Sequence, residues 1–160
     1  MTMNMRRLFS SAAALLTGAL LLCAGAAPLM AATWYAAPGA NGSGTSAADP
    51  GDLRALVETR AAAGDTVRLS AGTFNVKTGG LYSGINIDRP LFLIGAGRGK
   101  TILKDLNEVV VLRIEAAAGT PATMAVKSMT LLDGGNYQLD IVRGSPTIEN
   151  VEFLGTAITA

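Results

Sequence analysis

The sequence contains no histidine and a single cysteine, Cys23. Histidine is the commonest general base near neutral pH and the commonest transition-metal ligand, so its absence argues against zinc sites and histidine-dependent catalytic triads. A lone cysteine cannot form an intramolecular disulfide. In an oxidising compartment the folded chain must therefore be held together by its core alone.

Charged and aromatic residues are also scarce, at 16% and 5% of the 160 residues, whereas 49% are hydrophobic. This composition is typical of one packed domain and excludes a disordered chain. Setting aside Arg6 and Arg7 leaves 11 of the 13 basic residues against 12 acidic ones, so the chain from residue 33 onward has a net charge of −1. A near-neutral chain with scattered charges has no basic face for nucleic acid or anionic membranes, and we expect neither partner.

Residues 1–32 have the pattern of a secretory signal peptide. Arg6 and Arg7 precede an apolar stretch at 8–27, and small residues follow, with cleavage predicted after Ala32. Ala24-Gly25-Ala26 offers an alternative cleavage site. Polar, glycine and proline residues interrupt the stretch, which therefore lacks the about 20 uninterrupted apolar residues of a membrane anchor. We expect export to the periplasm, the cell surface or the extracellular space.

Cys23 also follows three leucines, as the acylated cysteine of a lipoprotein signal can. Such a signal has Gly, Ala or Ser directly before the cysteine, and Leu22 does not fit. The sequence therefore favours ordinary cleavage over a lipid anchor at Cys23.

One amphipathic helix is predicted, from about Pro50 to Ala63. Asp49 is placed as the N-cap, Pro50 at the first helical position and Asp52 in the first turn, where a carboxylate meets free N–H groups. Gly64 supplies the left-handed residue that follows the helix. Apolar residues recur at helical spacing, at Leu53, Leu56, Val57 and Ala61.

Short β-rich segments separated by Gly, Asn, Asp and Pro occupy the chain from Asp65 onward, and helical periodicity does not return. Together with a strand at 33–36, this density of strands is compatible with a sandwich, a barrel or a β-solenoid. The predicted strands are Thr66–Leu69, Thr73–Val76, Ile85–Ile87, Leu91–Ile94, Thr101–Leu103, Val109–Ile114, Thr123–Val126, Met129–Leu131, Leu139–Val142 and Thr147–Phe153.

An internal repeat favours the solenoid. A shift of 22 places aligns four pairs of apolar residues, and it aligns Ser128 with Asn150, where a tight turn requires a small polar residue that tolerates left-handed geometry. A period of roughly 20 to 25 residues, with three strands per turn, is typical of solenoids. We therefore expect side chains to point inward in stacked coils at Val126, Met129, Leu131, Ile148, Val151 and Phe153.

A series of motifs runs from residue 33 to about residue 155. They are Trp34-Tyr35-Ala36-Ala37-Pro38-Gly39-Ala40-Asn41-Gly42-Ser43-Gly44-Thr45, the predicted helix, Gly64-Asp65-Thr66-Val67-Arg68-Leu69, Ala71-Gly72-Thr73-Phe74, and Arg89-Pro90-Leu91-Phe92-Leu93-Ile94-Gly95-Ala96-Gly97 before Thr101-Ile102-Leu103. This order resembles the start of right-handed parallel β-helix proteins of the pectin-lyase-like superfamily. The resemblance implies an all-β fold, a right-handed parallel β-helix of about four coils with an N-terminal capping α-helix. It specifies the fold better than the activity.

The segment Gly95-Ala96-Gly97-Arg98-Gly99-Lys100-Thr101 looks like a phosphate-binding loop but fails on spacing. A P-loop needs glycine at the position of Ile94 and a helix after Thr101, where the sequence predicts a strand. We expect a turn between coils.

Asp133, Asp140 and Arg143 are the nearest candidates for a catalytic or cation site. The family resemblance implies Ca²⁺, which in pectate lyases neutralises a uronate carboxylate while Arg or Lys takes the ring proton. No family catalytic motif matches these three residues, so the interpretation as solvated turn residues is favoured, and no cofactor is assigned. Four aromatic residues could stack on sugars, Trp34, Tyr35, Tyr82 and Tyr137, although Trp34 is expected in the core.

Three functions are compatible with this fold: an enzyme acting on polysaccharide, a surface adhesin or autotransporter-type scaffold, and a non-catalytic fragment of either. Residues 33–160 would form the cap and first coils of a longer β-helix, because the segment Thr147–Phe153 is followed by no polar cap. We therefore expect polysaccharide binding without catalysis by this chain alone. We also expect self-association through the open C-terminal end.

Overall fold

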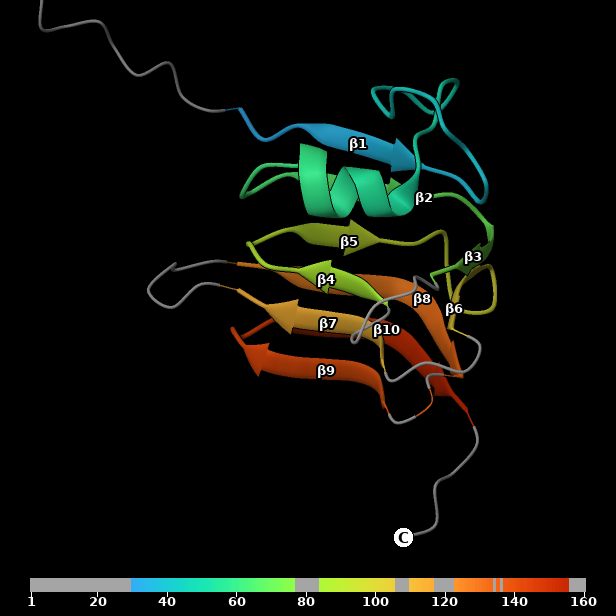
Figure 1. Ribbon diagram of the computed structural model, residues 1–160, viewed down its shortest axis with the longest axis vertical. Coiled ribbons are helices and arrows are strands. Elements are labelled where there is room, and N and C mark those ends of the chain that lie inside the picture. Colours follow the sequence, from blue (N-terminus) through green and yellow to red (C-terminus); the bar gives the residue numbers. More distant parts are fainter. Residues whose placement is uncertain are drawn as a thin grey trace, which may run out of the picture. The chain divides into compact units, whose positions relative to one another are not determined.

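Ten β-strands and one short helical segment make up the part of the chain that the structure describes (Figure 1). The computed structural model describes residues 30–76, 84–105, 110–116, 123–133, 135 and 137–155. Cys23, Tyr82 and most of the predicted signal peptide lie outside the described residues. Within the described ranges, no helix is long and apolar enough to cross a membrane.

The strands pair only in parallel and form two sheets, which confirms the all-β prediction. The smaller sheet contains β4 (Ile85–Ile87), β7 (Val110–Glu115) and β9 (Tyr137–Arg143). The larger sheet contains β1 (Thr33–Ala36), β2 (Thr66–Leu69), β3 (Gly72–Asn75), β5 (Phe92–Ile94), β6 (Thr101–Asp105), β8 (Ala125–Asp133) and β10 (Thr147–Leu154).

Strand β8 joins two ladders of the larger sheet. Its first residues pair with β5, its last residues pair with β6, and β10 pairs with it along both parts. The change of direction falls at Ser128, with φ 57°, and at Asn150 in β10, with φ 53°. Asn150 Nδ2 donates to Ser128 Oγ across the two strands at 3.3 Å. The predicted alignment and left-handed turn are confirmed, although the two strands predicted on either side of Ser128 form one bent strand.

Replacing Ser128 with valine is expected to lower the free energy of unfolding by about 1 to 2 kcal/mol, because a β-branched residue is strained at positive φ. Ser128→Gly should leave it nearly unchanged, since glycine adopts this conformation freely. Urea unfolding of both variants measures the difference. Equal losses for valine and glycine would show that backbone strain at the bend does not matter.

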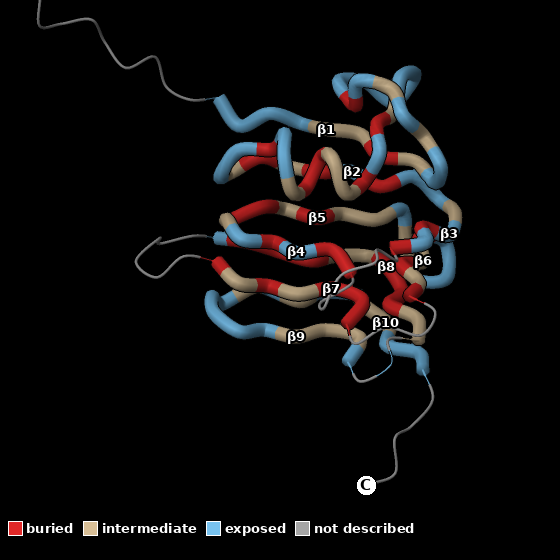
Figure 2. Tube along the Cα trace, in the orientation of Figure 1, coloured by how far each residue is buried: buried red, intermediate tan, exposed pale blue. Residues whose placement is uncertain are grey.

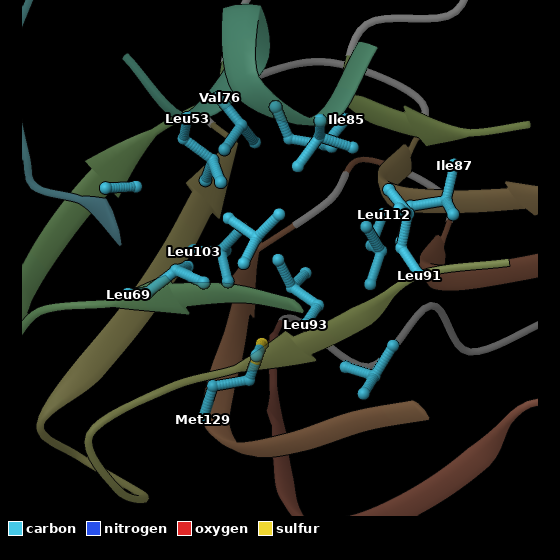
Figure 3. Packing of buried hydrophobic residues seen from close by; sticks show 14 of the residues in the cluster. Leu53, Leu69, Val76, Ile85, Ile87, Leu91, Leu93, Leu103, Leu112 and Met129 are labelled. Carbon is cyan, nitrogen blue, oxygen red and sulfur yellow. The ribbon is translucent and has the colours of Figure 1, made fainter. Parts of the chain in front are cut away.

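Alternate side chains of both sheets point into one shared core. Figure 3 shows Leu103 of the larger sheet and Leu112 of the smaller sheet in the same cluster, and both are fully buried. Of the six residues predicted to point inward, Val126, Met129 and Leu131 are buried, whereas Ile148 and Val151 are partly buried against the core. Phe153 is 47% exposed because, among the described residues, no strand follows β10 in its ladder.

The predicted α-helix from Pro50 to Ala63 is wrong in its bounds and type. Helical residues begin at Leu53, and the segment from Ala55 to Arg60 is a π-helix, η1. Gly51 is instead bridged to Ala36 of β1, which keeps the chain extended up to that point. The N-terminal capping side chain is therefore Asp52, not Asp49, and its Oδ1 accepts from the N–H of Ala55 at 2.8 Å.

The apolar face of η1 was predicted correctly, since Leu53, Leu56, Val57 and Ala61 are all buried. Arg89, which precedes β5, fixes the end of the helical segment. Its guanidinium donates to the carbonyls of Val57, Glu58 and Ala61 at 3.0, 2.9 and 2.7 Å. These groups would otherwise lack intrahelical partners at the negative end of the helix dipole.

Candidate functional site

The predicted candidates Asp133, Asp140 and Arg143 do not share a site. Asp133 at the end of β8 lies 3.5 Å from Lys104 Nζ in the larger sheet. Asp140 lies 3.2 Å from Arg113 Nη1 in the smaller sheet, where Arg143 forms an ion pair with a glutamate of β7. Within the described ranges, no group of three acidic, cysteine or histidine residues could hold a metal ion.

The sequence reasoning missed a pair of acids on adjacent strands. Asp105 and Asp133 are in register, 28 residues apart, whereas only an offset of about 22 was considered. A carboxylate pair on neighbouring coils could serve glycoside hydrolysis if both acids reached the substrate. Asp105 is fully buried, so an external polysaccharide cannot contact both members of this pair.

The aromatic candidates differ in their surroundings. Trp34 packs against the core, as predicted, and its Nε1 donates to Asp65 Oδ2 at 2.9 Å. Tyr137 on β9 is 57% exposed. Tyr35 on β1 is half-buried and lines a groove, which makes it the aromatic residue best placed to position a ligand.

The groove, which we call the Tyr35–Arg68 groove, lies where β1 and β2 pair, on the outer side of the larger sheet. Tyr35 is in register with Arg68, and both side chains point away from the core because Trp34 and Val67 beside them point inward. Its volume is about 160 Å³. The lining residues are Tyr35, Ala36, Ala37, Ala47, Pro50, Arg68, Leu69 and Ser70.

The loop that forms one wall of this groove is fixed by hydrogen bonds to β1. The N–H of Tyr35 donates to Gly44 O, and the N–H of Gly51 donates to Tyr35 O, both at 2.8 Å. Within the loop, the carboxylate of Asp49 accepts from the N–H of Ser43 at 3.0 Å. Hydrogen bonds from the side chain and backbone of Ser43 hold the pKa of Asp49 below its ordinary value. The groove is therefore bounded by a loop that is already ordered.

Arg68 is the cation of this groove. It is exposed and forms no ion pair with any residue that the structure describes, whereas the guanidinium of Arg113 contacts Glu115 and Asp140. A guanidinium presents several N–H donors in one plane and can bind a carboxylate through two of them. Arg68 beside the ring of Tyr35 can thus bind an anionic group while the ring contacts an apolar face.

A second cavity, of about 270 Å³, lies beside the start of the helical segment and is lined by Asp52, Arg54 and Asn75, among others. The guanidinium of Arg54 is already engaged by Glu58 and by the carbonyl of Val76. The cavity also adjoins residues 77–83, which lie outside the described part of the chain. We therefore assign the candidate site to the Tyr35–Arg68 groove.

The glycine-rich segment 95–101 is a turn, as predicted. Gly95 and Gly97 donate their N–H groups to the carbonyls of Lys127 and Ser128, both at 2.9 Å, and Thr101 begins strand β6 instead of a helix. The backbone donors that a phosphate loop would offer are therefore used by β8. In comparisons with known proteins, no family model, no curated protein and no solved structure matches this chain.

Proposed function

We propose that this chain is an exported, right-handed parallel β-helix protein of the pectin-lyase-like type that binds acidic polysaccharide in the Tyr35–Arg68 groove. The observation that carries the proposal is an exposed arginine without a described carboxylate partner beside a half-buried tyrosine, in a groove with an ordered wall. A uronate unit offers the two complementary features, a carboxylate and an apolar ring face.

The β-helix assignment is supported by the way the ladders stack. Val67, Leu93, Val126 and Ile148 follow one another in register through β2, β5, β8 and β10. Strands of the smaller sheet recur in the same sequence order, and the helical segment contacts β4, the first of them. Parallel pairing of successive turns of chain is typical of a solenoid, and a helical segment over its first turn would act as its cap.

The export assignment rests on the signal-peptide pattern of residues 1–32, and the fold favours the earlier cleavage site. The N–H of Ala32 donates to Asp65 Oδ1 at 2.7 Å, and its carbonyl accepts from Thr66 at 2.9 Å. Cleavage after Ala26 would keep both bonds, whereas cleavage after Ala32 would remove them. N-terminal sequencing of the exported protein distinguishes the two sites, and a chain that still begins at Met1 would contradict export with processing.

Replacing Arg68 with alanine is expected to weaken binding of an oligogalacturonate by at least tenfold, because the carboxylate loses its charged partner. Arg68→Lys should restore part of the affinity, since it keeps the charge without the planar donor pair. Tyr35→Ala should weaken binding as well. Isothermal titration of the full exported chain measures these changes.

The matched control is Arg143→Ala, which removes the same charge from an exposed position on the smaller sheet. It should leave the affinity within about twofold, since its distance from the groove permits only a screened interaction. Equal affinity of the wild type and Arg68→Ala, or equal losses for Arg68→Ala and Arg143→Ala, would refute the assignment of the groove.

A further inference from the structure

The last strand of each sheet has a free edge among the residues that the structure describes. β10 pairs only with β8, and β9 pairs only with β7. Figure 2 shows these two strands at the end of the stack opposite β1, with intermediate and exposed residues along them. Free backbone groups and exposed apolar side chains together mark an interaction surface. The large apolar side chains exposed there are Tyr137, Ile141, Val142, Phe153 and Leu154.

The outer row of β10 adds negative charge to this edge. The side chain of Glu149 is 62% exposed, and that of Glu152 is 29% exposed. Hydrogen bonds from Arg98 and from Thr130 hold the pKa of Glu152 below its ordinary value, so it is a carboxylate at neutral pH. A strand that pairs with this edge must therefore place cations or hydroxyl donors opposite the two glutamates.

Strand β8, on the other side of β10, already has such a pattern. Lys127 Nζ lies 2.6 Å from Glu149, and Thr130 Oγ1 lies 3.0 Å from Glu152. Its inward residues are apolar and lie in register with those of β10. The sequence Ala-Val-Lys-Ser-Met-Thr-Leu-Leu of residues 125–132 thus matches β10 in both charge and apolar positions.

We infer that the free edge of β10 binds an extended protein segment in parallel, and that this segment resembles β8, with a basic residue opposite Glu149, a hydroxyl opposite Glu152 and apolar residues between them. The bound segment would cover Ile148 and Val151, which are only partly buried, and Phe153. Backbone hydrogen bonds supply the affinity in this mode of recognition, and the alternating side chains supply the specificity. This inference does not depend on the Tyr35–Arg68 groove.

A second copy of the chain is the less suitable occupant. The edge of β1 is closed by the loop that bonds to Tyr35 through Gly44 and Gly51, so a head-to-tail stack of copies is blocked. Two copies could still join through β10 in antiparallel orientation. Keeping the inward residues inward then sets Glu149 opposite Glu152 of the other copy, and like charges directly opposite each other destabilise a strand pair. The charge pattern therefore favours a basic segment over self-association.

The test uses the full exported chain and two fluorescent peptides. One has the sequence of residues 123–132, and the other differs only by glutamate in place of Lys127. We expect the lysine peptide to bind at least tenfold more tightly in fluorescence anisotropy. The protein variant Glu149→Lys should reverse this preference, a result that a merely sticky apolar edge would not give.

Two results would overturn the inference. One is equal binding, or no binding, of the two peptides to the wild-type chain. The other is a stable dimer at neutral pH in light scattering that the lysine peptide does not dissociate, because a second copy would then occupy the edge. Phe153→Ser separates the contributions, since it should weaken both peptides equally while Glu149→Lys changes their order.

Discussion

Replacing Leu103 with alanine is expected to lower the free energy of unfolding by about 3 to 4 kcal/mol. Leu103 is fully buried in β6 and lies in register between Phe74 and Leu131, so its side chain is enclosed by the coils on both sides. Figure 3 shows it at the centre of the cluster, between residues of both sheets. Parallel strands on both sides fix the backbone, which prevents the surroundings from closing the cavity.

Urea unfolding followed by circular dichroism measures this loss, and Leu154→Ala is the matched control. Leu154 is 46% exposed on β10, so the same truncation there should cost less than about 1 kcal/mol. Similar losses at the two positions would mean that the centre of the stack is not where the protein gains its stability.

Most strands could be predicted from the sequence because short runs of alternating residues are bounded by residues that break strands. The spacing of the coils could not. The offset of 22 residues holds between β8 and β10, but Val67 and Leu93 are 26 residues apart and Leu93 and Val126 are 33 apart. Turns of unequal length separate the strands, and a turn can gain residues without changing the ladder. For this reason the in-register acids Asp105 and Asp133 were missed.

The helix prediction failed because a local pattern was overruled by a tertiary contact. Asp49-Pro50 has the local features of a helix start, yet Gly51 donates to the carbonyl of Tyr35, and its carbonyl accepts from Ala37. These bonds complete the edge of β1 and delay the helix to Leu53. The apolar spacing after that point depends on burial, so it was predicted correctly.

The candidate site was half predictable. Tyr35 was named as an aromatic that could bind sugar, but nothing in the sequence joined it to Arg68, which is 33 residues further along the chain. The parallel register of β1 and β2 brings them together, and the alternation of Trp34 and Val67 inward decides that both point outward. A search for outward residues at matching positions of the first two strands could have found the pair.

Replacing Asp65 with asparagine is expected to lower the free energy of unfolding by about 3 kcal/mol at pH 7. Its buried carboxylate accepts from the N–H groups of Ala32 and Ala62, at 2.7 and 2.8 Å, and from Trp34 Nε1 at 2.9 Å. These bonds join the first strand, the turn after the helical segment and β2. An asparagine amide would turn one NH₂ group toward at least one of the three donors, which leaves a buried donor unsatisfied.

The same substitution should change how stability depends on pH. Burial raises the pKa of Asp65, but the hydrogen bonds from Trp34, Ala32 and Ala62 outweigh it and hold the pKa of the folded state below its ordinary value. The stabilisation is therefore complete above the unfolded pKa, about 3.9, and is lost as the pH falls through the lower folded value. The difference between wild type and Asp65→Asn should shrink between pH 5 and pH 3. Glu149→Gln, an exposed ion-pair partner, should change stability by less than about 1 kcal/mol. A difference for Asp65→Asn that stays constant down to pH 3 would show that the charge of Asp65 does not hold the first strand in place.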